Sequence, residues 1–298
     1  MMNYISHASK MTGRRLLLVR AFLTMRALLT LSALLSLCTF SYASAASNVV
    51  TPSIRTTIEL PLQGVTLEYK ANVRLLQVLD DANASGSIGY FPLSAQLFDK
   101  TNTEANESNK ANKTIEAKKR NVFNQLDAFS VEEPEAKLVK QQLASFQYLN
   151  RVFIELDRNA VISQSDKNPL LVSSSNTNKP SDSQIQAFSL YLPQRPTSIQ
   201  LMGAMKESVT MNLIEHGTLN DYLDALPNGF IGEAVDKSVA YVIQPDGVVQ
   251  TIQYAYWNEQ PVYLAPGAIV FMAFYSLPSE YSTLNQDIVD LLRHKVVL

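Results

Sequence analysis

The chain has 298 residues, of which 46% are hydrophobic, and its 25 basic and 27 acidic side chains give a net charge of −2. Five basic residues lie in the first 46 positions, where no acidic residue occurs, so the remainder holds 20 basic and 27 acidic residues and a net charge of −7. An acidic chain of this kind is not expected to have nucleic acid or anionic lipid as its main partner.

The first 46 residues have the organisation of a secretory signal peptide. Basic residues are followed by an almost wholly apolar run over residues 27–40 and by small residues at 43–45, which predict cleavage after Ala45 or Ala46. An uncleaved anchor is the alternative, although the run is short for a membrane span. We therefore expect a periplasmic protein that has no stable membrane insertion once the signal is removed.

The only cysteine, Cys38, lies inside this apolar run. Leu37 before it is bulkier than the residue that a lipoprotein signal places there, so lipidation is not expected. After cleavage the chain has no disulfide, no thiol nucleophile and no thiolate metal site. Translation from Met11 or Met25 instead of Met1 would change only the length of the segment that is removed.

The mature chain begins with a predicted strand hairpin and a helix. Apolar residues alternate on both sides of a turn at residues 61–64, and from Val73 their spacing becomes helical. Residues 86–98 follow as a strand or loop rich in glycine and aromatic residues.

A helical hairpin is predicted between about residues 100 and 150. The first half of the segment 101–120 has the composition of a solvated stretch, but apolar residues from Val122 onward indicate a helix. Ser130, with Glu133 three residues later, has capping-box spacing and predicts the start of a second helix. We expect these helices to form an antiparallel pair inserted into a sheet domain.

Strands resume after the hairpin. Residues 151–157 and 185–192 predict two strands, and the second ends at the stiff joint 193–196, whose two prolines cannot donate to a sheet ladder. The element order then recurs, with two strands, a short helix near 216–227, a hairpin turning at 245–247 and a last strand. This recurrence favours two modules with a hinge at the joint.

The C-terminal half contains four segments of distinctive sequence: LPQRPTSIQLMGA, AYVIQPDGVVQ, AYWNEQPVYLAPGAIVFMAF and LNQDIVDLLRHKV. They resemble the capsule (group 4) and exopolysaccharide biosynthesis and secretion proteins of the GfcC and YjbG type. The resemblance is tight from Leu192 to the end of the chain and looser before Arg151.

The resemblance implies an α+β fold with two β-grasp domains, related to SLBB domains. On this basis the signal peptide (1–46) precedes a first domain at 47–193 with its inserted helical hairpin, a second domain at 194–277 and an amphipathic helix at 278–298. The family is periplasmic and non-enzymatic. The implied partners are a Wza-like outer-membrane polysaccharide export channel, the polymer, or both.

The last helix carries one continuous apolar stripe. Ser282 or Thr283 can cap its start, and the basic residues 293–295, with a partly charged His294, suit its negative end. The stripe either packs on the chain's own body or docks into a partner's groove, and the amphipathic helices of the related channel proteins favour docking. Its members are Leu284, Ile288, Leu291, Leu292 and Val296, at helical spacing.

Nothing in the sequence predicts a catalytic centre, a metal site or a cofactor. Only His216 and His294 remain after signal cleavage, and no nucleophile, zinc or phosphate-loop motif occurs. We predict a non-enzymatic accessory protein for capsule or exopolysaccharide secretion or assembly. A polysaccharide hydrolase or lyase with a carboxylate pair is one alternative, because the separation of two acids cannot be read from a sequence. A purely structural envelope protein is the other.

Two arginines are candidates for binding. Arg151 corresponds, by the resemblance, to a prominent arginine that opens the strand after the hairpin. Its planar guanidinium can anchor an acidic sugar or a partner's carboxylate, or it can pair with Glu155 on the same strand face. Arg195, between two prolines, is expected to brace the two domains against each other.

Two aromatic residues, Tyr256 and Trp257, are further candidates. Together with Tyr254 they can stack on the apolar faces of sugar rings, provided that the strand continues this far. Packing inside the core is the favoured alternative, because aromatic residues beside a hairpin usually fill the inner face of a sheet.

Overall fold

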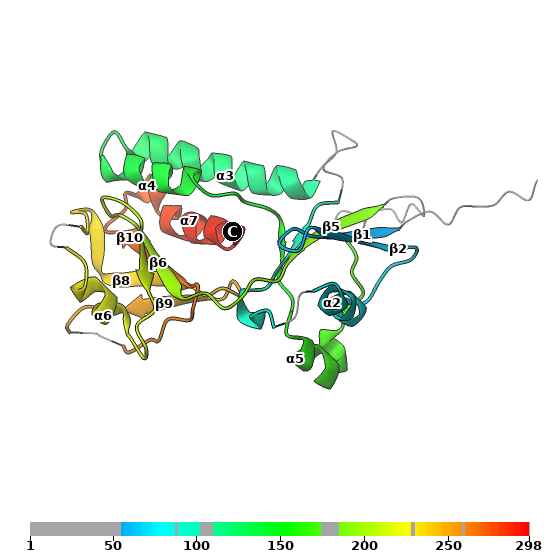
Figure 1. Cartoon of the computed structure of the whole chain (residues 1–298). Coiled ribbons are helices and arrows are strands. Elements are labelled where there is room, and N and C mark those ends of the chain that lie inside the picture. The colour runs from blue at the N-terminus through cyan, green and yellow to red at the C-terminus, as the bar shows by residue number, and fades with distance from the viewer. Residues whose placement is uncertain are drawn as a thin grey trace, which may run out of the picture. The chain divides into compact units, whose positions relative to one another are not determined.

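The computed structural model describes residues 55–86, 89–101, 110–173, 185–227, 230–257 and 260–297, which belong to one compact unit, Ile54–Leu298. They form an α+β protein with two five-stranded mixed sheets and several helices (Figure 1). The predicted α+β class is thereby confirmed. The predicted signal peptide, residues 1–46, lies outside the described residues.

The first sheet has the strand order β2-β1-β5-β3-β4, in which β1 and β5 run parallel and the other neighbours antiparallel. The predicted turn between the first two strands is confirmed, and Gly64 supplies its positive φ of 66°. The strands are β1 Thr56–Leu60, β2 Val65–Tyr69, β3 Gln96–Asp99, β4 Arg151–Val152 and β5 Gln186–Tyr191. The accompanying helices are α2 Leu75–Ala84, α5 Arg158–Ser163 and the short 3-10 helices η1 Pro92–Ser94 and η2 Ser165–Lys167.

Strand β4 is shorter than predicted. The sequence predicts a strand over residues 151–157, but only Arg151 and Val152 pair with β3. Val152 lies opposite Leu97 in this antiparallel register, so the residues after Val152 lie opposite the segment that precedes β3. That segment contains the 3-10 helix η1, which begins with Pro92, a residue without an N–H. The longer strand is wrong because its partner ends there.

The second sheet repeats the connectivity of the first. Its order β7-β6-β10-β8-β9 matches the first sheet strand by strand, with β6 and β10 parallel and the other neighbours antiparallel. A helix follows the second strand in both sheets, so the predicted recurrence of the element order is confirmed. The elements are β6 Ser198–Gly203, β7 Val209–Asn212, α6 Leu219–Asp224, β8 Val235–Ile243, β9 Val249–Gln253 and β10 Ile269–Phe274.

The segment between β3 and β4 forms helices α3 (Lys110–Phe129) and α4 (Glu135–Ala144). The predicted cap at Ser130 is wrong. Its Oγ donates to the carbonyl of Asp127 at 2.7 Å, at the end of α3, and Pro134 holds the N-cap position of α4. Proline suits the start of a helix, because an N–H there would find no intrahelical acceptor.

Helices α3 and α4 pack on the second sheet, although their sequence interrupts the first. Figure 1 shows both helices beside α7 and the strands of that sheet. Buried Gln142 of α4 accepts a hydrogen bond from Gly203 N at 2.9 Å and donates to the carbonyls of Gly203 and Met205 at 3.1 and 3.2 Å. The core of the second sheet includes Ile115, Val122, Leu126 and Phe129 from α3 and Ala136, Val139 and Leu143 from α4.

The last helix, α7, spans Leu284–Leu292 and follows the 3-10 helix η4 at Ser279–Tyr281, so it is shorter than predicted. Its apolar stripe packs on the chain's own body, which is one of the two predicted alternatives. In this arrangement the stripe is not accessible to a partner. Each of its residues, Leu284, Ile288, Leu291, Leu292 and Val296, is at most 2% exposed.

Replacing Ile288 by Ala is expected to lower the free energy of unfolding by about 2–5 kcal/mol, because it leaves a cavity in the core that α7 shares with α3 and the second sheet. The matched control is Val131→Ala, since Val131 is 87% exposed. A surface change of that kind is expected to cost less than about 0.5 kcal/mol. Urea denaturation followed by circular dichroism measures both, and equally small effects would show that α7 does not pack in this core.

Candidate functional site

Arg151 lies at the contact between the two sheets. It opens β4 in the first sheet, and its guanidinium donates to the carbonyl of Pro245, in the β8–β9 turn of the second sheet, at 2.6 Å. Longer contacts of 3.5 Å reach the carbonyls of Ala95 and Arg293. Arg151 is 7% exposed, and burial lowers the pKa of its guanidinium to about 10, against the effect of nearby Asp246. Main-chain oxygens therefore hold this charge.

The turn between β8 and β9 inserts against Arg151. Gly247 has φ 90°, and a Cβ at this position would lie 2.6 Å from the ring of Phe153. Its carbonyl accepts a hydrogen bond from Arg293 Nε at 2.9 Å. The predicted hairpin turn at 245–247 is confirmed, and two arginines from outside the hairpin hold it in place.

The ring of Phe153 packs against both guanidinium groups. Its centroid lies 5.4 Å from Cζ of Arg151 and 4.4 Å from Cζ of Arg293, so both cations face its π electrons. His294 packs on the same ring, with 5.5 Å between the two centroids. Neither Phe153 nor Arg293 is among the predicted binding residues, because no local pattern links them to Arg151.

His294 is neutral in this setting. Its Nδ1 accepts a hydrogen bond from the main-chain N–H of Arg151 at 3.1 Å. Burial, followed by the positive charges of Lys118, Arg293 and Arg151, lowers the pKa of the imidazole to about 4. The predicted partly charged imidazole at the helix end is therefore wrong. The predicted position of His216 in a turn is confirmed, where it has φ 57° and a side chain that is 86% exposed.

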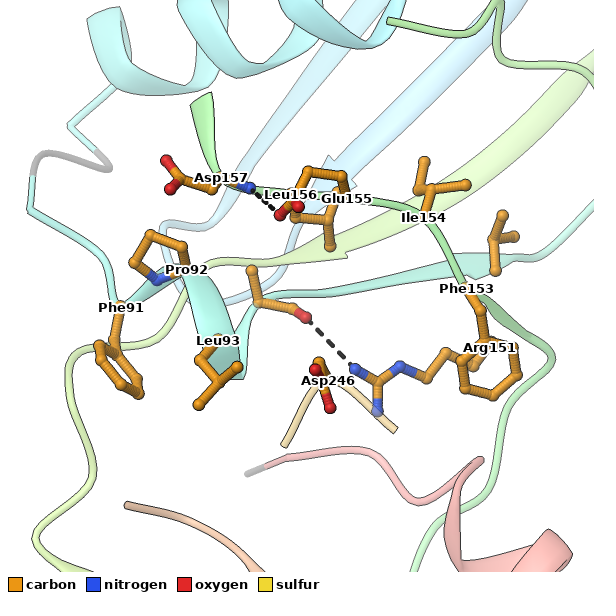
Figure 2. Close-up of a pocket in the computed structure, with 12 residues that line it drawn as sticks. Phe91, Pro92, Leu93, Arg151, Phe153, Ile154, Glu155, Leu156, Asp157 and Asp246 are labelled. Atoms are coloured by element: carbon orange, nitrogen blue, oxygen red, sulfur yellow. Dashed lines mark hydrogen bonds between the residues drawn. The ribbon is translucent and has the colours of Figure 1, made fainter. Parts of the chain in front are cut away.

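A cavity of about 460 Å³ opens beside Arg151 (Figure 2). The guanidinium donates towards the carbonyl of Ala95, and Figure 2 shows Asp246 next to Arg151. The cavity combines one cation with apolar side chains and carboxylates, and its size is typical of a small-molecule site. Its lining includes Phe91, Pro92, Leu93, Phe153, Ile154 and Leu156, together with the acids Glu155, Asp157 and Asp246.

Glu155 is not the partner of Arg151. Its carboxylate accepts from the main-chain N–H of Asp157 and pairs with Lys167 Nζ, each at 3.1 Å. These contacts lower the pKa of Glu155, with the main-chain hydrogen bond as the largest cause. The predicted Arg151–Glu155 ion pair is therefore wrong: both residues line the cavity, but Glu155 pairs with Lys167.

Arg195 lies outside the cavity lining and is exposed. Its Cζ stands 5.6 Å from the ring centroid of Phe91, which does line the cavity. The main-chain N–H of Phe91 also donates to the carbonyl of Pro193 at 2.8 Å. The joint between the sheets thus touches the rim of the cavity, while the bracing role of Arg195 stays a prediction.

Tyr256 and Trp257 lie away from both the core and the cavity. They are 97% and 75% exposed, so the predicted core packing is wrong for both residues. Strand β9 ends at Gln253, and the chain turns at 256–257, so the alternation that would have turned Tyr256 inward is lost. Tyr254 alone is partly buried, and its hydroxyl donates to the carbonyl of Asp236. Stacking of Tyr256 and Trp257 on sugar rings stays a prediction.

Over the ranges that the structure describes, no helix is long and apolar enough to cross a membrane. Within the same ranges, His, Cys, Asp and Glu side chains do not gather in threes or more as a metal centre would require.

Two comparisons with known proteins agree with each other. Residues 207–297 match the family model described as "Capsule biosynthesis GfcC C-terminal". The chain is also similar to the "Uncharacterized protein YjbG" of Escherichia coli (strain K12), with 25% identity over 160 residues. That alignment covers 53% of this chain and 59% of the relative, so the chain spans less than two thirds of the relative's length.

Replacing His294 by Asn is expected to reduce the acid sensitivity of folding. The imidazole pKa is about 4 in the folded chain and about 6.5 when unfolded, so the unfolded chain binds more protons between these values. The neutral imidazole therefore contributes to the free energy of unfolding above about pH 6.5. This contribution, on the order of 3 kcal/mol, is lost as the pH falls towards 4. Asn keeps an acceptor for the Arg151 N–H but does not titrate.

Thermal unfolding at about pH 7 and about pH 4.5 measures this difference. The matched control is His216→Asn, because the imidazole of His216 is exposed. If all three proteins lose stability equally on acidification, His294 is not held neutral by the fold.

Proposed function

Because the chain is of the GfcC and YjbG type, we propose that it is a periplasmic, non-enzymatic accessory protein of capsule or exopolysaccharide assembly that binds the polymer beside Arg151. The periplasmic location rests on the signal peptide predicted for residues 1–46. We further infer that the two sheets of matching connectivity are β-grasp domains of the SLBB-like kind.

One observation carries the binding proposal: a buried guanidinium lines an open cavity and is held by main-chain carbonyls instead of a carboxylate. A buried charge is costly unless an opposite charge pairs with it. A carboxylate of an acidic ligand would therefore be stabilised beside the guanidinium of Arg151. The rings of Phe91 and Phe153 offer apolar surface for the faces of sugar rings. An acidic polysaccharide has both a carboxylate for the guanidinium and apolar ring faces for these aromatic side chains.

The polymer is a better candidate for direct contact than the export channel. Docking on the channel through α7 would need the apolar stripe, and every member of the stripe is buried in the chain's own body. We therefore propose that an outer-membrane export channel acts on the same polymer and that α7 holds the site together.

A polysaccharide hydrolase is the second candidate, because three carboxylates line the cavity. All three have local partners: Glu155 pairs with Lys167, Asp157 caps α5 by accepting from Asn159 N, and Asp246 accepts from Val248 N. A glycosidase needs a proton donor with a raised pKa, whereas the pKa of Glu155 is lowered. Binding fits these contacts better than hydrolysis.

Binding of a polyuronate such as alginate, compared with the neutral polymer dextran, tests the proposal. The purified mature chain is expected to bind the polyuronate, and Arg151→Lys to weaken this binding by about tenfold, because an ammonium cannot reproduce the planar, forked donation of a guanidinium. Arg120→Lys, a change at an exposed arginine of α3, is the matched control. Asp246→Asn is expected to strengthen binding, because it removes a negative charge beside the site.

The two alternatives give different results in the same experiment. New reducing ends that disappear in Glu155→Gln would establish the hydrolase. Equal binding of alginate and dextran, or no effect of Arg151→Lys and Asp246→Asn, would contradict the proposed site. If the chain binds neither polymer, a purely structural role in the envelope is favoured.

A further inference from the structure

Arg151 also lines a second cavity, of about 470 Å³, which shares no other lining residue with the first. Its walls come from β6, β7, β8 and β10 of the second sheet, from Leu62 and Gln96 in the first-sheet part of the chain, and from the joint between the sheets. Lys295 and Val297, just beyond α7, complete it. The cavity is therefore assembled from parts of the chain that are far apart in sequence.

Lys295 lines this cavity, and its ammonium group has no acidic partner among the described residues. Its Nζ donates to Gln200 Oε1 at 2.8 Å and lies 4.3 Å from the ring centroid of Phe146. In the described part of the chain, no carboxylate stands within ion-pair distance of this group. Burial lowers the pKa of Lys295 to about 8.

Apart from Lys295 and Arg151, the lining is uncharged and mixes polar with apolar residues. Among the described residues that form it, none is acidic, in contrast to the first cavity. Amides and hydroxyls alternate with apolar side chains, a mixture that suits a ligand with several hydroxyl groups and an apolar ring face. The polar residues are Gln96, Gln194, Ser198, Gln200, Thr210 and Gln244, and the apolar ones include Pro196, Ile199, Ile243 and Ile269.

A purely structural role does not account for Lys295. Its ammonium gains one hydrogen bond to a neutral amide and one aromatic ring, which offset only part of the cost of burial. An apolar side chain of similar length would pack there without that cost. The ammonium is thus placed where an anion can pair with it.

We propose that this second cavity binds one hexuronate unit of an acidic polysaccharide, with the sugar carboxylate on Lys295 and the hydroxyls on the surrounding amides and hydroxyls. The preference for an anion follows from the cavity alone. The choice of a sugar rests on the proposed function.

Isothermal titration of the purified mature chain with glucuronate, glucose and inorganic phosphate tests the proposal. Glucuronate is expected to bind, whereas glucose, which lacks the carboxylate, and phosphate, which lacks the ring, bind at least about tenfold more weakly. Lys295→Met is expected to weaken glucuronate binding by about tenfold or more while keeping or raising the melting temperature, since it removes a buried unpaired charge. Lys237→Met, at an exposed position of β8, is the matched control.

Gln200→Glu provides an independent variant in case Lys295→Met does not fold. Its carboxylate would stand where the amide now accepts from Lys295 Nζ, so it is expected to raise the melting temperature and to block glucuronate. Glucuronate binding that survives in both variants, or phosphate binding as tight as that of glucuronate, would overturn the proposal.

The two proposals fail separately. Polyuronate binding that depends on Arg151, without glucuronate binding that depends on Lys295, would overturn the second site and leave the proposed function standing. Glucuronate binding that depends on Lys295, without polymer binding, would support the cavity and overturn the proposed function.

Discussion

The structure depends on a crossed packing arrangement. Helices α3 and α4 are encoded between two strands of the first sheet, yet their apolar faces complete the core of the second. The contact is specific, because Gln142 bonds the main chain of Gly203, where a Cβ would collide with the main chain of Met272. The chain crosses back after α7, where Val296 packs with Phe98 and Tyr191 of the first sheet. Free movement about the joint at 193–196 would have to break both crossings, which limits the predicted hinge.

The distribution of charge at the contact between the two sheets follows from this packing. Arg151, Arg293 and Lys295 meet there. Main-chain carbonyls, amides and aromatic rings surround them, with Asp246 near Arg151 and Asp290 at 3.9 Å from Arg293. Burial, and after it the positive charges nearby, lowers the pKa of His294, which accordingly stays neutral and serves as an acceptor. A junction with this excess of positive charge, in a chain whose mature part is predicted to be acidic, is suited to attract a polyanion to one locality.

Much of the local structure could be predicted from the sequence. Alternating apolar residues and turn residues locate the hairpins around Gly64 and Gly247, and the recurrence of element order anticipates two sheets of the same connectivity. The residue Arg151 was reached through resemblance. An apolar stripe on a helix shows that this face is buried but does not show which sheet it packs against. The packing of α3 and α4 on the second sheet was therefore not predictable from the sequence. Phe153, Arg293 and Lys295 were missed for a related reason, since only tertiary packing brings them to Arg151.

The side chain of Gln96 joins β3 to the far end of the described chain, since it accepts from Val297 N at 2.9 Å across 201 positions. Closing so long a loop costs more entropy than forming a hairpin, and contacts between distant residues slow folding. Each sheet hairpin can therefore form early, whereas the second cavity, which Lys295 and Val297 help to line, is complete only after the last residues have docked. If the second cavity binds a ligand as proposed, a newly synthesised chain would bind nothing there until that step, so binding in this cavity would report that folding is complete.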